Sequence, residues 1–472
     1  MAETPAVAAD PTSAARPLAS ARRILLPLAL AQFICSFAGS NMNVMINDIS
    51  EDLNTSVKGV QTAITLFLLI MAILMIPCSK LTDRWGRKRC FMGGLALYGV
   101  GALVSAAAPN LGILILGNSV LEGVGTALLI PPVYILATLW FSDITSRAWA
   151  FGVISGLGGI GAAAGPLIGG VITTGISWRA AFIFQAAVVA TIMLLSRRMV
   201  DPLAADPTRP FDAIGAVLSG AGLFCIVFGI LQAGTNNKLM TVFLVVGALF
   251  LAAFFLFIRS CERRGKEPLL STRLFKNRVC NLALITQNIQ WLLLMGVSFV
   301  ISVFLQEVRG YSAIKTGVVF TAATLGILFS SLSSARLAKR YAQRTLVIAG
   351  FLITLVGMGL LIGLVPATDS VWAFVPGLAL VGVGLGTMLT PSVNVVQSSF
   401  PEAMQGEISG LSRSVSNLGS SFGTAIAGTI LVALVARGNA AFAWSLGSLI
   451  VIGLLGLLAA IRLPAKIEPQ AG

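Results

Sequence analysis

A series of apolar blocks, each about as long as the hydrocarbon core of a membrane is thick, is the feature that most constrains this chain. Short polar segments separate the blocks, so each one is bounded on both sides. We predict that each block is a membrane-spanning helix. The fourteen predicted spans are 24–46, 59–79, 90–108, 112–139, 148–172, 180–196, 213–234, 240–258, 280–305, 315–335, 346–366, 372–398, 410–436 and 442–461.

The composition excludes several other classes of protein. Only 11% of the 472 residues are charged, which is less than half of the share that soluble domains carry. Histidine is absent, so no imidazole can act as a metal ligand, a base or a pH sensor. The six cysteines have no CxxC or zinc-type spacing, and the chain has no G-x-x-x-x-G-K-[ST] loop for ATP. We therefore predict an all-α polytopic membrane protein that is not an enzyme and uses no cofactor or metal.

The positions of the basic residues predict how the chain crosses the membrane. With the N-terminus in the cytoplasm, 25 of the 32 Lys and Arg residues lie in cytoplasmic loops or tails and six lie on the other side. This asymmetry is what the positive-inside rule predicts. We expect a multi-pass protein of the plasma (cytoplasmic or inner) membrane with both termini cytoplasmic. The net charge of +14 then indicates contact with anionic membrane lipid, not with nucleic acid.

Three patterns recur in the same order in the two halves of the chain. The loops 79–89 and 335–344 share a small–basic–Leu–small pattern that is followed by Arg and an aromatic residue. The fourth and twelfth spans carry G-x-G-T and then Pro, and the fifth and thirteenth carry G-x-x-x-G. Two homologous halves are typical of alternating-access transporters. The predicted organisation is a disordered cytoplasmic tail (1–23), a six-helix bundle (24–198), a linker with two inserted helices (199–279), a second six-helix bundle (280–462) and a cytoplasmic tail (463–472).

These motifs resemble those of a known family. The loop 79–88 is similar to the cytoplasmic signature G-x-L-a-D-R-x-G-R-k of the major facilitator superfamily, with Ser79 in place of the first Gly, and the segment 161–170 resembles its antiporter motif. The fourteen spans, Phe211-Asp212 and the segment 267–270 resemble the 14-helix drug:proton antiporter family. The resemblance covers nearly the whole chain, and it implies two six-helix bundles, two extra inserted helices, a central cavity and alternating access.

The charged loop after the second span has two interpretations. Asp83 lies inside a basic cluster, and a charge-assisted latch from this loop to the other bundle would favour one conformation. Alternatively, the basic residues only orient the loop. Arg413, near the inner end of the thirteenth span, is either a cytoplasmic gate or an interfacial anchor. The predicted latch and gate residues are Asp83, Arg84, Gly86, Arg87, Lys88 and Arg413.

The antiporter motif also has two interpretations. Its small residues would let neighbouring helices approach closely, and its proline would bend the fifth span. Ordinary packing of small residues would produce the same pattern, so a role in transport remains one of two alternatives. The motif residues are Gly161, Gly165, Pro166, Gly169 and Gly170.

Two residues that the resembled family ties to proton movement are missing. Ala38 stands where that family carries Asp in the first span, and Ser119 stands where it carries Arg in the fourth. Glu122 is the acidic residue that lies deep in a predicted span, where a charged carboxylate is costly and the protonated form is favoured. We predict that Glu122 carries whatever proton coupling exists. The alternative is a protonated Glu that only bonds to a neighbouring helix.

The other polar side chains within the predicted spans are neutral, and they are densest in the ninth span. Such a broad, weakly polar cavity suits a bulky apolar or amphiphilic solute. We therefore predict a monomeric exporter of drug-like hydrophobic or amphiphilic compounds, cations included, that is driven by protons. A facilitator or a lipid or metabolite transporter without strict proton coupling, and a non-transporting sensor or scaffold, remain alternatives. The predicted cavity residues are Asn41, Asn43, Asn118, Ser119, Gln287, Asn288, Gln290, Trp291 and Asn394.

Overall fold

The computed structural model describes residues 18–141, 144–202, 204–208, 210–233, 235–337, 340–368, 370–399 and 405–464. Among these residues, thirteen helical segments are long and apolar enough to cross a membrane, and α7 supplies the fourteenth when its two bent segments are taken as one span. Each of the fourteen predicted spans coincides with one of these segments. The prediction of an all-α polytopic membrane protein is therefore confirmed.

The first half of the chain contains α1 (Leu18–Asn41), η1 (Met42–Met45), α2 (Ile46–Asp52), α3 (Val57–Trp85), α4 (Arg87–Ala106), α5 (Leu111–Leu114), η2 (Ile115–Glu122), α6 (Gly123–Trp140), α7 (Ile144–Gly175) and α8 (Trp178–Ser196). Then follow α9 (Ala213–Leu231), α10 (Asn237–Arg263) and α11 (Thr272–Lys276). The second half contains α12 (Arg278–Val303), η3 (Phe304–Val308), α13 (Ala313–Leu337), α14 (Gln343–Leu364), η4 (Val371–Ala373), α15 (Phe374–Ser398), α16 (Gln405–Ala433), η6 (Val435–Arg437) and α17 (Asn439–Ile461).

Polar caps fix where several spans begin, because the first backbone N–H groups of a helix need an acceptor. Ser56, Ser177 and Asp212 accept such bonds at the starts of α3, α8 and α9. Gly86, with a φ of +97°, separates α3 from α4, a conformation that suits glycine. The first helix begins at Leu18, so it includes the end of the segment 1–23 that we expected to be disordered. Residues 1–17 and 465–472 of the predicted tails lie outside the described residues.

Close helix pairs built on glycine recur in the two halves. A Cβ atom at Gly161 of α7 would lie 2.3 Å from the Phe33 carbonyl oxygen of α1. In the second half, a Cβ atom at Gly423 of α16 would lie 2.1 Å from the Leu292 carbonyl oxygen of α12. The recurring G-x-x-x-G pattern therefore has the same physical effect twice, which is close contact between the first and fifth helices of a bundle.

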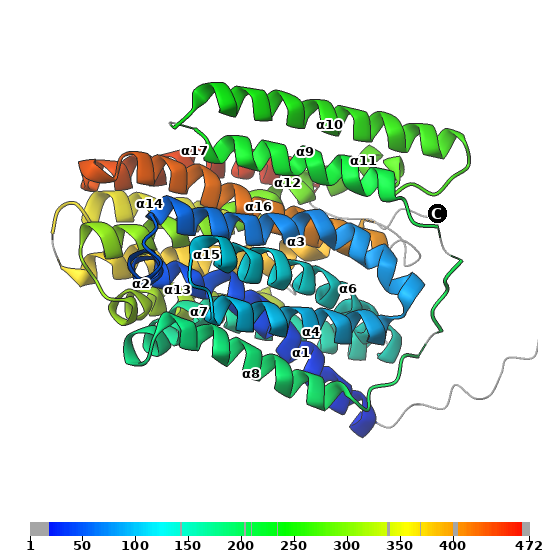
Figure 1. The fold of residues 1–472 in the computed structure, drawn as a ribbon. Helices are drawn as coiled ribbons and strands as arrows, with labels where there is room; N and C mark the ends of the chain where they lie inside the picture. Colours follow the sequence, from blue (N-terminus) through cyan, green and yellow to red (C-terminus); the bar gives the residue numbers. More distant parts are fainter. Residues whose placement is uncertain are drawn as a thin grey trace, which may run out of the picture.

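The two inserted helices lie side by side along the outside of the molecule (Figure 1). Val227 and Leu231 of α9 share a buried apolar cluster with Leu69 of α3 and Ala425 of α16, so α9 contacts both halves of the protein. The outer helix α10 packs on α9. Of the residues in its most apolar stretch, only 17% are buried. Its exposed apolar side chains, including Leu249, suit contact with lipid.

Candidate functional site

The two bundles are joined at both ends of the molecule. We call the end that carries the loop 79–89 the motif end, and the opposite end the far end. At the far end, the Gln306 side chain donates to the Asn43 carbonyl oxygen at 2.9 Å and accepts from the Asn47 backbone N–H at 3.2 Å. At the motif end, Lys80 of α3 and Glu407 of α16 form an ion pair of 2.5 Å.

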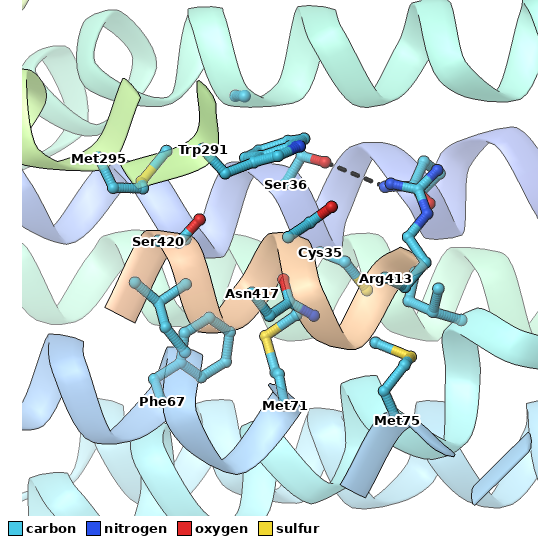
Figure 2. Close-up of a pocket in the computed structure, with 16 residues that line it drawn as sticks. Cys35, Ser36, Phe67, Met71, Met75, Trp291, Met295, Arg413, Asn417 and Ser420 are labelled. Atoms are coloured by element: carbon cyan, nitrogen blue, oxygen red, sulfur yellow. Dashed lines mark hydrogen bonds between the residues drawn. The ribbon is translucent and has the colours of Figure 1, made fainter. Parts of the chain in front are cut away.

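A pocket of about 50 Å³ lies between the bundles (Figure 2). Helices α1, α3, α6 and α7 of the first half and α12 and α16 of the second half contribute to its wall. The described wall combines sulfur-containing, aromatic and small polar side chains with one charged side chain, that of Arg413. The lining residues are Gln32, Cys35, Ser36, Gly39, Phe67, Leu68, Met71, Met75, Ile130, Ala162, Trp291, Met295, Arg413, Ser416, Asn417 and Ser420.

Arg413 begins a chain of polar contacts that crosses from one bundle to the other. Its guanidinium group donates to the Tyr134 hydroxyl and lies over the Tyr134 ring, 4.6 Å from the ring centroid. The Tyr134 hydroxyl donates to the Gln32 side-chain carbonyl oxygen at 3.1 Å, and the Gln32 amide donates to the Ser36 hydroxyl at 3.1 Å. Arg413 is thus both a pocket residue and a link between α16 and α6.

Of the nine cavity residues predicted from the sequence, Trp291 lies in the wall of this pocket. Several of the others hold helices together. Gln287 donates to the hydroxyls of Ser412 and Ser416 at 2.9 and 2.8 Å, Asn288 donates to the Val415 carbonyl oxygen at 2.9 Å, and Ser119 donates to the Ala63 carbonyl oxygen at 2.8 Å. Asn41, Asn43, Asn118 and Gln290 are buried, whereas Asn394 is exposed.

Glu122 is fully buried in the first bundle and does not line the pocket. It ends the π-helical segment η2, and the Ser105 hydroxyl of α4 donates to its Oε1 atom at 3.4 Å, whereas its Oε2 atom is buried without a hydrogen-bond partner. Cys35, which lines the pocket, lies within electrostatic range of Glu122. The carboxyl group therefore lies behind the pocket wall.

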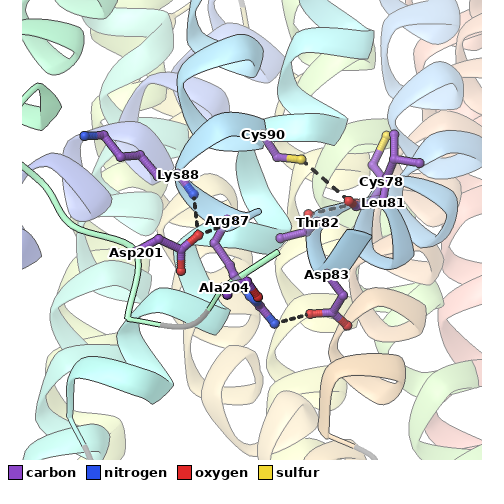
Figure 3. A network of polar contacts seen from close by, with 9 residues as sticks. All are labelled: Cys78, Leu81, Thr82, Asp83, Arg87, Lys88, Cys90, Asp201 and Ala204. Carbon is purple, nitrogen blue, oxygen red and sulfur yellow. Dashed lines mark hydrogen bonds and ion pairs between the residues drawn. The ribbon is translucent and has the colours of Figure 1, made fainter. Parts of the chain in front are cut away.

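The charged loop at the motif end connects α3, α4 and the linker that follows α8 (Figure 3). Arg87 pairs with Asp83 at 2.6 Å, and its guanidinium also donates to the Ala204 carbonyl oxygen at 3.3 Å. One Asp201 oxygen accepts from the backbone N–H groups of Arg87 and Lys88 at 2.7 and 3.2 Å. These contacts lie within the first half and the linker.

Lys80–Glu407 is an ion pair that does reach the other bundle, and sequence reasoning missed it. The two residues lie more than 300 positions apart, and each belongs to a segment with several charges. The role of Tyr134 was also not predicted. Its position deep in a span could have indicated it, because the hydroxyl group of a buried tyrosine needs a hydrogen-bond partner.

The antiporter motif packs α7 on two helices at once. A Cβ atom at Gly165 would lie 2.0 Å from the Ser40 hydroxyl of α1, and one at Gly170 would lie 2.5 Å from the Ala313 carbonyl oxygen of α13. Gly169 faces Asn41. The helix bends by 43° between Gly152–Ala162 and Ala164–Gly175, one turn before Pro166, as expected where proline removes a hydrogen bond to the preceding turn.

Two helical bundles that surround a central pocket are the architecture of a class of membrane transporters. The chain belongs to the Major Facilitator Superfamily, whose family model matches residues 28–424 and, in a second match, 283–470. The predicted resemblance is thereby confirmed, and the chain is a member of a transporter family and not an enzyme.

Drug efflux and resistance proteins are among the proteins similar to this chain. The chain is 31% identical to the puromycin resistance protein pur8 of Streptomyces alboniger over 411 residues, which cover 86% of this chain and 81% of the relative. It is 29% identical to the multidrug efflux pump LfrA of Mycolicibacterium smegmatis, with 91% and 83% of the two chains covered. A crystal structure of a peptide transporter POT in complex with sulfate matches with a TM-score of 0.70 at 17% identity, covering 95% of this chain and 96% of that one. This last likeness shows the fold alone.

Proposed function

We propose that this protein exports apolar or amphiphilic, drug-like compounds across the plasma membrane by alternating access. The observation that carries the proposal is the central pocket, because both bundles contribute to its wall and a change in their relative position would open it to one side or the other. Met71, Met75 and Met295 give the wall adaptable, polarisable surface that suits solutes of varied shape. The drug efflux and resistance proteins among the relatives support the same class of solute.

We further propose that Glu122 couples transport to protons. A carboxyl group that is buried among neutral side chains favours its protonated form, and a change in packing that admits water would favour release of the proton. Cys35 of α1 lines the pocket and lies within electrostatic range of Glu122, so a solute that shifts α1 would also change the surroundings of Glu122. Glu122 acts in this proposal through helix packing, because it does not contact the pocket.

The charge of the pocket bears on the expectation that cations are among the solutes. The charged side chain in its described wall is Arg413, a cation, and no carboxylate lines it. A cationic solute would therefore meet a like charge, which is unfavourable in a site of low dielectric constant. We propose neutral or anionic amphiphiles in place of cations. With both termini cytoplasmic, as the basic loops predict, export would carry them from the side of the motif end.

Proteoliposomes with an imposed pH gradient test the proposed function. We would measure uptake of pyrenebutyramide, a neutral fluorescent amphiphile, together with the internal pH, and compare the results with protein-free liposomes. Accumulation that is driven by the gradient and accompanied by proton flux is the expected result. Downhill flux alone would identify a facilitator. If neither this amphiphile nor its anionic or cationic analogue is transported, the protein is a sensor or scaffold and the proposal is wrong.

A further inference from the structure

We propose that Arg413 binds an anionic head group of the solute, so that the pocket selects amphiphiles that carry a carboxylate. This inference rests on the proposed function, since it names the class of solute for the same pocket. It follows from the charge of the pocket wall, the partners of Arg413 and the distribution of polar and apolar side chains along the pocket.

The first argument is the charge balance around Arg413. An arginine side chain is always protonated, and a buried or half-buried guanidinium group is stabilised when a counter-charge lies against it. The ion pairs of the described residues are Lys80–Glu407, Arg87–Asp83 and Arg179–Asp52, and none of them includes Arg413. Its hydrogen-bond partner is the neutral hydroxyl of Tyr134. An anion in the pocket would supply the charge that the protein wall does not.

The second argument is the geometry of the guanidinium group. It has five N–H donors in a planar fork that matches a carboxylate in a two-bond arrangement. Tyr134 accepts one hydrogen bond and covers one face of the fork at 4.6 Å from the ring centroid. Stacking of this kind orients the group without occupying its remaining donors. Tyr134 is therefore a positioning residue for Arg413.

The third argument is the polarity along the pocket. Figure 2 shows Arg413 at one end, Ser36 beside Trp291 in the middle, and Met295, Phe67 and Ser420 toward the other end. A solute with its head group at Arg413 would place an apolar body against aromatic and thioether surface, which stabilises it by burial. The arrangement fits an amphiphile with an oxyanion at one end and an aromatic or aliphatic body at the other.

Direct binding to the full-length protein in phosphatidylcholine nanodiscs tests this inference. The probes are pyrenebutyrate, its neutral amide pyrenebutyramide and the cationic pyrenebutylamine, which share one apolar body. Binding is measured by energy transfer from tryptophan to pyrene, with empty nanodiscs as the background. The Trp291→Phe variant identifies the part of the signal that comes from the pocket. The variants are Arg413→Gln, Arg413→Lys and Tyr134→Phe, each checked for folding by size-exclusion chromatography.

The expected result is that the wild-type protein binds the carboxylate about ten- to a hundredfold more tightly than the amide, as hydrogen bonds to charged groups imply. The amine should bind most weakly. Arg413→Gln should equalise the carboxylate and the amide, Arg413→Lys should retain part of the preference, and Tyr134→Phe should retain most of it because the ring still stacks. If Arg413→Gln fails to fold, the affinities of the wild-type protein and of Arg413→Lys for the carboxylate and the amide test the inference instead.

Three results would overturn the inference. One is equal binding of the carboxylate and the amide to the wild-type protein, and another is an unchanged preference in Arg413→Gln. The third is loss of pyrenebutyrate binding when phosphatidylglycerol is added to the nanodiscs, which would assign the site to an anionic lipid. Binding and transport of all three probes without regard to head group would leave the proposed function standing, whereas binding and transport of none would refute that function itself.

Discussion

The ion pair between Lys80 and Glu407 gives a quantitative test of how the two bundles are held at the motif end. The two side chains are 25% and 28% exposed, and their charged atoms lie 2.5 Å apart. The perturbation is Glu407→Gln, which removes the charge at nearly the same volume. Lys80→Gln and the double variant complete a double-mutant cycle. We avoid exchanging the two charges, because Glu407 lies in the first turn of α16, where the helix dipole favours an acid over a base.

The magnitude follows from the exposure of the pair. Solvent-exposed ion pairs contribute about 0.2–1 kcal/mol, and partial burial places this one at about the upper end of that range. A contact worth about 1 kcal/mol that exists in one conformation only changes the ratio of the two conformations about fivefold when it is lost. We therefore expect each single variant to shift the population about fivefold toward the conformation that is open at the motif end. The double variant should shift it no further.

The assay is the distance between spin labels on the two bundles, measured by electron–electron double resonance. Arg89 and Ala342 are exposed residues of the two corresponding loops at the motif end, so labels there would report the separation of the bundles. The native cysteines would first be replaced by alanine. The matched control is Asp52→Asn, which breaks the Arg179–Asp52 ion pair within the first bundle and should leave the distance distribution unchanged.

Two results would refute this reasoning. If the two single variants shift the distance distribution by no more than the Asp52→Asn control, the pair does not hold the bundles together. If the effects of the single variants add in the double variant, each residue acts through other contacts and the ion pair itself contributes nothing measurable.

The remaining predictions concern proton coupling, the motif loop, helix packing and orientation. Glu122→Gln should fold and keep downhill flux but lose accumulation driven by a pH gradient in proteoliposomes; unchanged uphill transport would make Glu122 a packing residue. Asp83→Asn should lower thermal stability, because Arg87, whose side chain is only 7% exposed, would lose the carboxylate that it pairs with, and it should slow transport and increase hydrogen exchange in the linker that follows α8; wild-type rates of transport and exchange would leave the loop with a role in orientation alone. Gly161→Ala should destabilise the protein by about 1–3 kcal/mol in thermal unfolding, since its Cβ atom would meet the α1 backbone, whereas Gly159→Ala, with nothing within 4 Å, should be neutral or stabilising; equal melting temperatures would contradict close α1–α7 packing. Reporter fusions should place both termini and the loop 259–278 in the cytoplasm, and an external signal from either terminus would exclude the predicted topology.

The sequence determined the number of spans, the two-fold repeat and the family, because each of these is recorded in a local pattern. A membrane span is defined by the hydropathy of about 20 consecutive residues, and a close helix contact by glycines four residues apart. Gly161 and Gly423 therefore showed from the sequence that helices would approach closely, although not which helices they would meet. The structure supplied the partners, α1 and α12.

Only the tertiary structure decided what each polar side chain in a span contacts. Gln287 and Trp291 are four residues apart and thus on nearly the same face of α12, yet Gln287 bonds to α16 and Trp291 lines the pocket. Glu122 is deep in a span, as the sequence indicated, but lies behind the pocket wall, and Arg413 meets Tyr134 across the two bundles. The physical reason is that each residue turns a helix by about 100°, so the face that a side chain occupies is fixed by how the helix is rotated against its neighbours. That rotation depends on the packing of all the helices together, which no single segment of the sequence records.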